Sequence, residues 1–247
     1  MKSHSSPDVF RFRGLRLVGV FTRPAGPSNK RFPAVLFLHG FPGSEKNVDI
    51  QRELMERGIA GFALHFSGAW GSEGRYRFTT LVPQALAALR FLKTRPFVDP
   101  RRVGIFGFSM GGWAAINTAA RAPAVKAVVA VSPAGGPEMI TPAMQSAINH
   151  LSSSLRVGST KALGRDFVKA VRSQDPAKSA AGLKTALLLV HGEKDDIVSP
   201  AISRRIYQAA GKRKKFVLAR GGAHDFLDRR DWLKRLVSSW FEKNLKN

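Results

Sequence analysis

Residues 103–116 read Val-Gly-Ile-Phe-Gly-Phe-Ser-Met-Gly-Gly-Trp-Ala-Ala-Ile. The apolar run at 103–106 predicts a buried strand, and the run at 113–116 favours a helix. Between them, the Gly107-x-Ser109-x-Gly111 spacing predicts a tight strand–turn–helix connection that projects the Ser109 hydroxyl beyond the end of a sheet. Side chains two residues before and after Ser109 would collide in such a turn, so glycine suits both positions. The stretch therefore predicts a serine nucleophile at a helix N-terminus.

Working outward from Ser109, short apolar runs alternate with amphipathic stretches along the 247 residues. This alternation is typical of a single α/β domain over 1–247 with a mostly parallel sheet flanked by helices. We predict an opening hairpin and an Asp99-Pro100 turn before the strand at 103–106. The eight predicted strands cover 10–13, 16–22, 34–38, 59–66, 103–106, 125–131, 186–190 and 215–218. The main helices cover 48–57, 79–95, 109–121, 200–210 and 226–243.

Residues 135–182 break this alternation. They contain two predicted helices, at 141–151 and 161–171, with no strand between them. An insertion that follows the carboxyl end of a strand in an open α/β sheet lies over the binding crevice. We therefore interpret 135–182 as a small helical lid within the domain.

A serine hydroxyl is a weak nucleophile and needs an adjacent base. Of the six histidines, His224 lies in the glycine-rich loop Arg220-Gly-Gly-Ala-His-Asp-Phe226, after the last predicted strand and before the last helix. A loop at that place can carry an imidazole back to Ser109. We predict His224 as the base, and we expect His39 to be structural.

A carboxylate beside the imidazole is needed to fix its tautomer and to stabilise the imidazolium. It is expected after the strand at 186–190, where His191-Gly-Glu-Lys-Asp-Asp196 supplies two adjacent aspartates. We predict Asp195 for this role, with Asp196 as the alternative. The three residues then follow one another as serine, aspartate and histidine. Folds with a Gly-x-Ser-x-Gly turn supply their nucleophile, carboxylate and base in this order.

Two backbone N–H groups are candidates for an oxyanion hole. Met110 begins the helix after Ser109, and Phe41 follows His39-Gly40 at the end of the strand 34–38. Gly40 lets the chain turn sharply toward the crevice, whereas Pro42 has no N–H to donate. Each preorganised donor is worth about 3–4 kcal/mol in a transition state.

Composition narrows the classes of function. The chain has no cysteine, which excludes disulfides and a cysteine nucleophile, and we expect no metal and no cofactor. The polar N-terminus and the short apolar runs predict no secretory signal and no membrane span, and they favour a cytoplasmic protein. A homodimer is compatible with the sequence.

The net charge of +23 comes from 40 Lys and Arg against 17 Asp and Glu. A field of this sign attracts nucleic acid and other polyanions. The basic residues are nevertheless scattered, with one dense run at 212–215, and no nucleic-acid motif accompanies them. We interpret the charge as a solvated surface and expect no specific nucleic-acid partner.

The sequence resembles the α/β-hydrolase superfamily over nearly its whole length. The residues that carry the resemblance are His39-Gly-Phe41, 99–104, 107–112, His191-Gly-Glu-Lys-Asp195 and His224, and Asp195 occupies the aspartate of the family's H-G-x-x-D-x-x-V pattern. The most similar groups are cinnamoyl and feruloyl esterases, dienelactone-hydrolase-like proteins and prolyl-oligopeptidase-like peptidases. The chain departs from dienelactone hydrolase in having no cysteine, and from prolyl-oligopeptidase-like peptidases in having no residues for a large N-terminal domain. It also lacks, at 65–72, the aspartate and arginine that the family often shows before the glycine-rich loop after its fourth strand. There, Trp70 is a candidate wall of an acyl pocket or a structural residue.

The resemblance implies a carboxylesterase that cleaves a small-molecule ester of small to medium acyl length through an acyl-enzyme on Ser109. Two alternatives stay open. The first is a serine peptidase or amidase, which needs an acidic site for a substrate ammonium group; residues 135–182 hold few acids, which favours esters. The second is a ligand-binding protein that keeps the hydrolase fold without catalysis.

Overall fold

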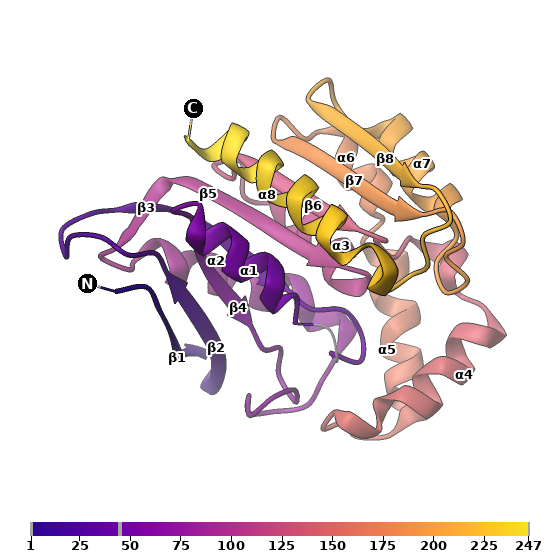
Figure 1. The fold of residues 1–247 in the computed structure, drawn as a ribbon. Coiled ribbons are helices and arrows are strands. Elements are labelled where there is room, and N and C mark those ends of the chain that lie inside the picture. Colours follow the sequence, from indigo (N-terminus) through magenta and orange to yellow (C-terminus); the bar gives the residue numbers. More distant parts are fainter. Residues whose placement is uncertain (1, 44–45, 247) are drawn as a thin grey trace.

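The computed structural model describes residues 2–43 and 46–246, and it contains the expected eight-stranded sheet (Figure 1). The strand order is β1-β2-β4-β3-β5-β6-β7-β8. The pairs β1–β2 and β2–β4 are antiparallel, and every other pair is parallel. The mixed, mostly parallel sheet confirms the α/β prediction. The strands are β1 His4–Phe12, β2 Leu15–Arg23, β3 Phe32–Leu38, β4 Ala60–Leu64, β5 Val98–Phe108, β6 Ala127–Val131, β7 Ala186–Gly192 and β8 Lys214–Ala219.

Helices cover both faces of the sheet. Alternate residues of a strand point to opposite faces, so Val35 and Phe37 pack under α1 and α8, whereas Leu36 and Leu38 pack toward α2 and α3. Both faces are thus apolar, as a parallel sheet requires. The helices are α1 Val48–Glu56, α2 Leu81–Lys93, α3 Met110–Ala119, α4 Pro142–Leu151, α5 Thr160–Ser173, α6 Pro176–Ala181, α7 Pro200–Ala209 and α8 Arg230–Lys246. Within the described ranges, no helix is long and apolar enough to cross a membrane.

Three boundaries differ from the sequence prediction. Asp99-Pro100 is not a turn before the strand but a part of β5. The register between β3 and β5 shifts here: Phe32 pairs with Val98, and Ala34 already pairs with Val103. The local irregularity accommodates a proline, which cannot donate to a regular ladder. The last helix begins at Arg230 instead of at Phe226, because Phe226 has a left-handed backbone (φ 57°). The first strand begins at His4 instead of at Phe10.

Three helices stand between β6 and β7, one more than the sequence indicated. Thr141, Ser159 and Asp175 cap them by accepting hydrogen bonds from the backbone N–H groups of Met144, Ala162 and Ala177. Helices α4 and α5 project from one end of the molecule (Figure 1), whereas the short α6 packs on α3 and α7. The role of 135–182 as a lid stays a prediction, and α4 and α5 are the part that projects.

Candidate active site

Ser109 stands at the sharp turn between β5 and α3. Its backbone has a positive φ of 53° and a ψ of −118°, a conformation that costs a non-glycine residue about 1–3 kcal/mol. A Cβ at Gly107 would collide with the Gly111 carbonyl, and a Cβ at Gly111 with the Leu38 carbonyl, so the turn closes only with glycine at both places. The Ser109 N–H donates to Val131 O (2.9 Å). The backbone around Ser109 is therefore strained and firmly held.

His224 and Asp195 meet at the carboxyl edge of the sheet. His224 Nδ1 donates to Asp195 Oδ2 at 2.7 Å, and both side chains are buried. The imidazole also packs on Phe108, the residue before Ser109, with 5.1 Å between ring centroids. Nε2 of His224 makes no hydrogen bond to any described residue, so it is the nitrogen left to accept a proton. Asp196, the alternative in the sequence, is exposed and does not contact His224.

The Asp195 carboxylate is surrounded by donors. Oδ1 accepts the backbone N–H groups of Ile197 (3.0 Å) and Val198 (2.8 Å), and Oδ2 lies 3.1 Å from Nε2 of the buried His191. Burial alone would raise the pKa of Asp195, but the contacts with His191, His224 and Val198 outweigh it and hold the pKa well below its usual range. Asp195 is therefore an ionised acceptor for the His224 N–H.

The loop after β3 lies against the serine turn. A Cβ on Gly40 would come within 3.1 Å of the Ser109 Cβ, so the chain leading to Phe41 passes directly beside the nucleophile. Met110 is the first residue of α3, where helical N–H groups have no partner within the helix. Neither Phe41 nor Met110 donates its N–H to another described residue. Their roles as oxyanion donors stay a prediction that this arrangement allows.

His39 is structural in its contacts, as expected. Its Nδ1 donates to Gly40 O (2.8 Å), and its Nε2 accepts the Phe66 N–H (3.2 Å). Burial lowers the pKa of His39 to about 4, with smaller contributions from His65 and Lys46. The imidazole is therefore neutral at pH 7, and it joins the loop after β3 to the loop after β4.

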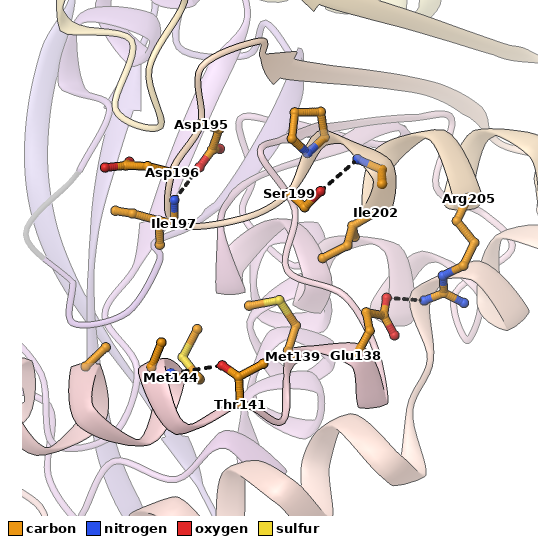
Figure 2. Close-up of a pocket in the computed structure, with 14 residues that line it drawn as sticks. Glu138, Met139, Thr141, Met144, Asp195, Asp196, Ile197, Ser199, Ile202 and Arg205 are labelled. Atoms are coloured by element: carbon orange, nitrogen blue, oxygen red, sulfur yellow. Dashed lines mark hydrogen bonds and ion pairs between the residues drawn. The ribbon is translucent and has the colours of Figure 1, made fainter.

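A cavity of about 840 Å³ opens beside Asp195, between α4 and α7 (Figure 2). Ser109 and His224 are not among its lining residues, so the cavity adjoins the carboxylate end of the candidate triad and not the nucleophile itself. The wall is mainly apolar, and the two aspartates lie at one end of it, away from Arg205. Its side chains include Met139, Met144, Ala147, Ile197, Ile202 and Arg205. Trp70 is not among them: it is half exposed and donates to Gly43 O (2.8 Å).

Sequence reasoning missed two residues of this region. The first is His191, whose Nε2 lies 3.1 Å from Asp195 Oδ2. The second is Arg205 of α7, which binds Glu138 (2.6 Å) and Asp175 (2.9 Å). The H-G-x-x-D spacing contained a signal for His191, because it places the histidine four residues before the carboxylate. Nothing in the local sequence of α7 points to the partners of Arg205.

Comparison with known proteins agrees with this architecture. The curated relatives include the uncharacterized peptidase YtmA of Bacillus subtilis, which is 29% identical over 193 residues, covering 75% of this chain and 71% of YtmA. The uncharacterized protein YfhR of Escherichia coli K12 is 24% identical over 215 residues, covering 85% of this chain and 70% of YfhR.

Solved structures share the fold. Est1E from Butyrivibrio proteoclasticus, determined with ferulic acid, superposes with a TM-score of 0.79 at 21% identity, covering 97% of this chain and all of Est1E. A puromycin-hydrolyzing peptidase of Mycobacterium tuberculosis gives a TM-score of 0.76 at 21% identity, covering 98% of this chain but 39% of the peptidase. These likenesses confirm the α/β-hydrolase fold.

The sequence profile of the prolyl oligopeptidase family matches residues 54–247, a range that contains Ser109, Asp195 and His224 and begins after Phe41. The match spans most of the chain, and it confirms the resemblance inferred from the motifs. The chain is a hydrolase with the α/β-hydrolase fold and belongs to the prolyl oligopeptidase family.

Proposed function

We propose that this hydrolase is a carboxylesterase that cleaves small to medium acyl esters through an acyl-enzyme on Ser109. The observation that carries the proposal is the 2.7 Å hydrogen bond from His224 to Asp195, made directly beside the strained serine turn. Nucleophilic acyl transfer requires a base that is held in one tautomer beside a projecting hydroxyl, and among the described residues Nε2 of His224 has no hydrogen-bond partner that would keep it from acting as that base.

The reaction proceeds in two halves. Ser109 Oγ attacks the ester carbonyl carbon while His224 Nε2 takes the hydroxyl proton, and the N–H groups of Phe41 and Met110 hold the oxyanion. His224 then gives that proton to the leaving alcohol as the acyl-enzyme forms. Water, deprotonated by His224, attacks the acyl carbon, and the carboxylic acid leaves as Ser109 regains its proton. Asp195 stabilises the imidazolium in both halves.

The cavity beside Asp195 is our candidate site for the apolar part of the ester. Its volume of about 840 Å³ and its methionine, alanine and isoleucine wall suit an aliphatic or aryl group of medium size. One wall comes from α4 in the region 135–182 and the other from α7, so α4 would contribute directly to substrate choice.

The contacts of Glu138 make it a poor site for the ammonium group of a peptide with a free amino terminus. A peptidase of that kind needs an unpaired carboxylate, and among the described residues of the cavity the exposed Asp196 has the one carboxylate without an ion pair. Glu138 lines the cavity but is paired with Arg205 at 2.6 Å, and Arg205 also holds Asp175. Some relatives are named as peptidases, so amide substrates belong in the test.

The first test is hydrolysis of p-nitrophenyl butyrate by wild type and Ser109→Ala. We expect the variant to lose activity by at least about 10³-fold while it keeps its unfolding transition. Ser238→Ala, which removes another buried serine hydroxyl far from the turn, is the control and should retain activity. Faster turnover of an aminoacyl-p-nitroanilide than of the ester would sink the esterase assignment, and unchanged ester turnover by Ser109→Ala would sink the whole proposal.

A second test separates the adjacent aspartates. Asp195→Asn should lower kcat by about 10³-fold or more, because the amide favours the wrong His224 tautomer. Asp196→Asn should lower kcat far less, because the exposed Asp196 side chain makes no hydrogen bond or ion pair with His224. The reverse ranking of the two variants would reassign the carboxylate.

A further inference from the structure

His191, at the end of β7, is a second imidazole at the candidate catalytic carboxylate. Its side chain has no exposed surface. Its Nε2 lies 2.8 Å from Val198 O and 3.1 Å from Asp195 Oδ2, the same carboxylate oxygen that accepts the His224 N–H. Two histidines, one at the end of β7 and one in the loop after β8, therefore converge on one oxygen.

The neighbours of His191 select one tautomer. Val198 O and the ionised Asp195 oxygen can only accept, so Nε2 must carry the hydrogen. On the other side of the ring, Nδ1 lies 2.7 Å from Oγ of Ser203, a residue of α7 with no exposed surface. In the neutral ring Nδ1 accepts, and the Ser203 hydroxyl donates. Ser203 thus orients the ring, and the ring presents a fixed N–H to Val198 and Asp195.

These contacts close a small circuit around the carboxylate. The Val198 N–H donates to Asp195 Oδ1 at 2.8 Å, while the Val198 carbonyl accepts from His191. One residue therefore links the histidine to the carboxylate through both of its backbone groups. This geometry accounts for the spacing of three positions in H-G-x-x-D-x-x-V: the imidazole of His191, the carboxylate of Asp195 and the backbone of Val198 are the members of the circuit.

We propose that His191, oriented by the Ser203 hydroxyl, is a positioning residue that holds the Asp195 carboxylate in register with His224. The inference rests on the proposed function, because it assigns His191 a part in the same serine chemistry. His191 touches neither Ser109 nor the cavity and acts only through Asp195.

A role of this kind affects the chemical step more than substrate binding. The Asp195–His224 contact matters most when the imidazolium forms, so a displaced carboxylate weakens the transition state and leaves the ground-state complex almost unchanged. Misplacement of a catalytic group by about 1 Å can cost on the order of 100-fold in rate. The expected signature of His191 variants is a fall in kcat with little change in KM.

Two amide substitutions give a matched test. His191→Gln can place its amide nitrogen near the position of Nε2 and so keep a donor toward Val198 and Asp195. His191→Asn carries the same amide on a shorter chain, reaches only the position of Nδ1, and removes the donor that His191 supplies to Val198 O and Asp195 Oδ2. The two variants differ in reach but not in polarity, and thermal unfolding of each shows whether its fold persists.

We expect His191→Asn to lose about tenfold or more in kcat for p-nitrophenyl butyrate, with KM within about twofold, and His191→Gln to recover most of the loss. The rate at which a fluorophosphonate labels Ser109 should follow the same order, because it reports activation of the serine without a cleavable substrate. Ser203→Ala should lower kcat by a smaller factor, since it removes only the group that orients the ring.

The outcomes separate the two proposals. If folded His191→Asn were labelled and turned over substrate at wild-type rates while Ser109→Ala was inactive, the inference would be overturned. The esterase function would still stand. If both amide variants lost kcat to the same extent and thermal stability to the same extent, His191 would have a purely structural role. That result would also overturn the inference. Failure of the wild-type protein to label at Ser109 or to cleave esters would overturn both proposals together.

Discussion

The guanidinium of Arg205 in α7 lies 2.6 Å from the carboxylate of Glu138, at the beginning of the segment 135–182. The same guanidinium makes two hydrogen bonds to Asp175, at 2.9 and 3.0 Å, near the end of that segment. A single arginine on the body of the domain therefore ties down both flanks of the projecting helices α4 and α5. Charge-assisted pairs of this bidentate kind combine strength with defined direction.

Replacement of Arg205 by methionine should loosen this attachment. The partners are partly exposed, so we expect a loss of only about 1 kcal/mol in the free energy of unfolding. Limited proteolysis should nevertheless cut within 135–182 faster than in wild type, because both flanks lose their partner. Arg204→Met is the control, since Arg204 is exposed and makes no ion pair with any described residue. Equal cutting rates in the two variants would contradict this role of Arg205.

Filling the cavity beside Asp195 should restrict the protein to esters with shorter acyl chains. Ala147 lines the cavity from α4, and Ala147→Phe would occupy part of its volume. We expect kcat/KM for p-nitrophenyl octanoate to fall by about tenfold or more while the acetate ester is cleaved almost as before, because only the longer chain needs the space. Ser146→Phe adds the same ring to an exposed neighbouring position outside the cavity. A uniform loss across all chain lengths would argue against this cavity as the acyl site.

His39 predicts a dependence of stability on pH. The folded protein lowers the pKa of His39 to about 4, whereas the unfolded chain titrates at its ordinary value of about 6.5. Between these values the unfolded state binds more protons, so the stability present above pH 6.5 is lost as the pH falls toward 4. The loss amounts to about 3 kcal/mol over this window. Its main physical cause is the burial of the imidazole, which disfavours the charged form. A protonated Nε2 could also no longer accept the Phe66 N–H.

Urea unfolding of wild type and His39→Gln at pH 7 and pH 4.5 measures this contribution. Glutamine can still accept a hydrogen bond but does not titrate, so the variant should lose less stability on acidification. His4→Gln, at an exposed position of β1, should behave as wild type does. Parallel loss of stability in all three proteins would show that His39 is not the source.

Much of the architecture was predictable from local sequence. Every predicted strand is present. These strands could be predicted because apolar runs such as Val128–Val131 and Leu187–Val190 are long enough to show that both faces of the strand are buried. The boundaries were less predictable. Asp99-Pro100 resembles a turn in isolation, and only its pairing beside Phe32 shows that it is an irregular part of β5. Helix α6 was missed because its six residues are too few for a periodic pattern.

The sequence by itself determined the serine turn, since Gly107 and Gly111 are required by contacts within a few residues and with the adjacent strand. It also narrowed the candidates for the carboxylate that orients His224 to Asp195 and Asp196, but the chemistry of the two side chains alone could not distinguish them. The tertiary structure decided that Asp195 meets His224, 29 residues away, and that His191 and Ser203 surround it. It also decided that Arg205 joins Glu138 and Asp175. Such partners depend on which loops and helices pack together at the end of the sheet, and neither the periodicity nor the composition of any one segment specifies that packing.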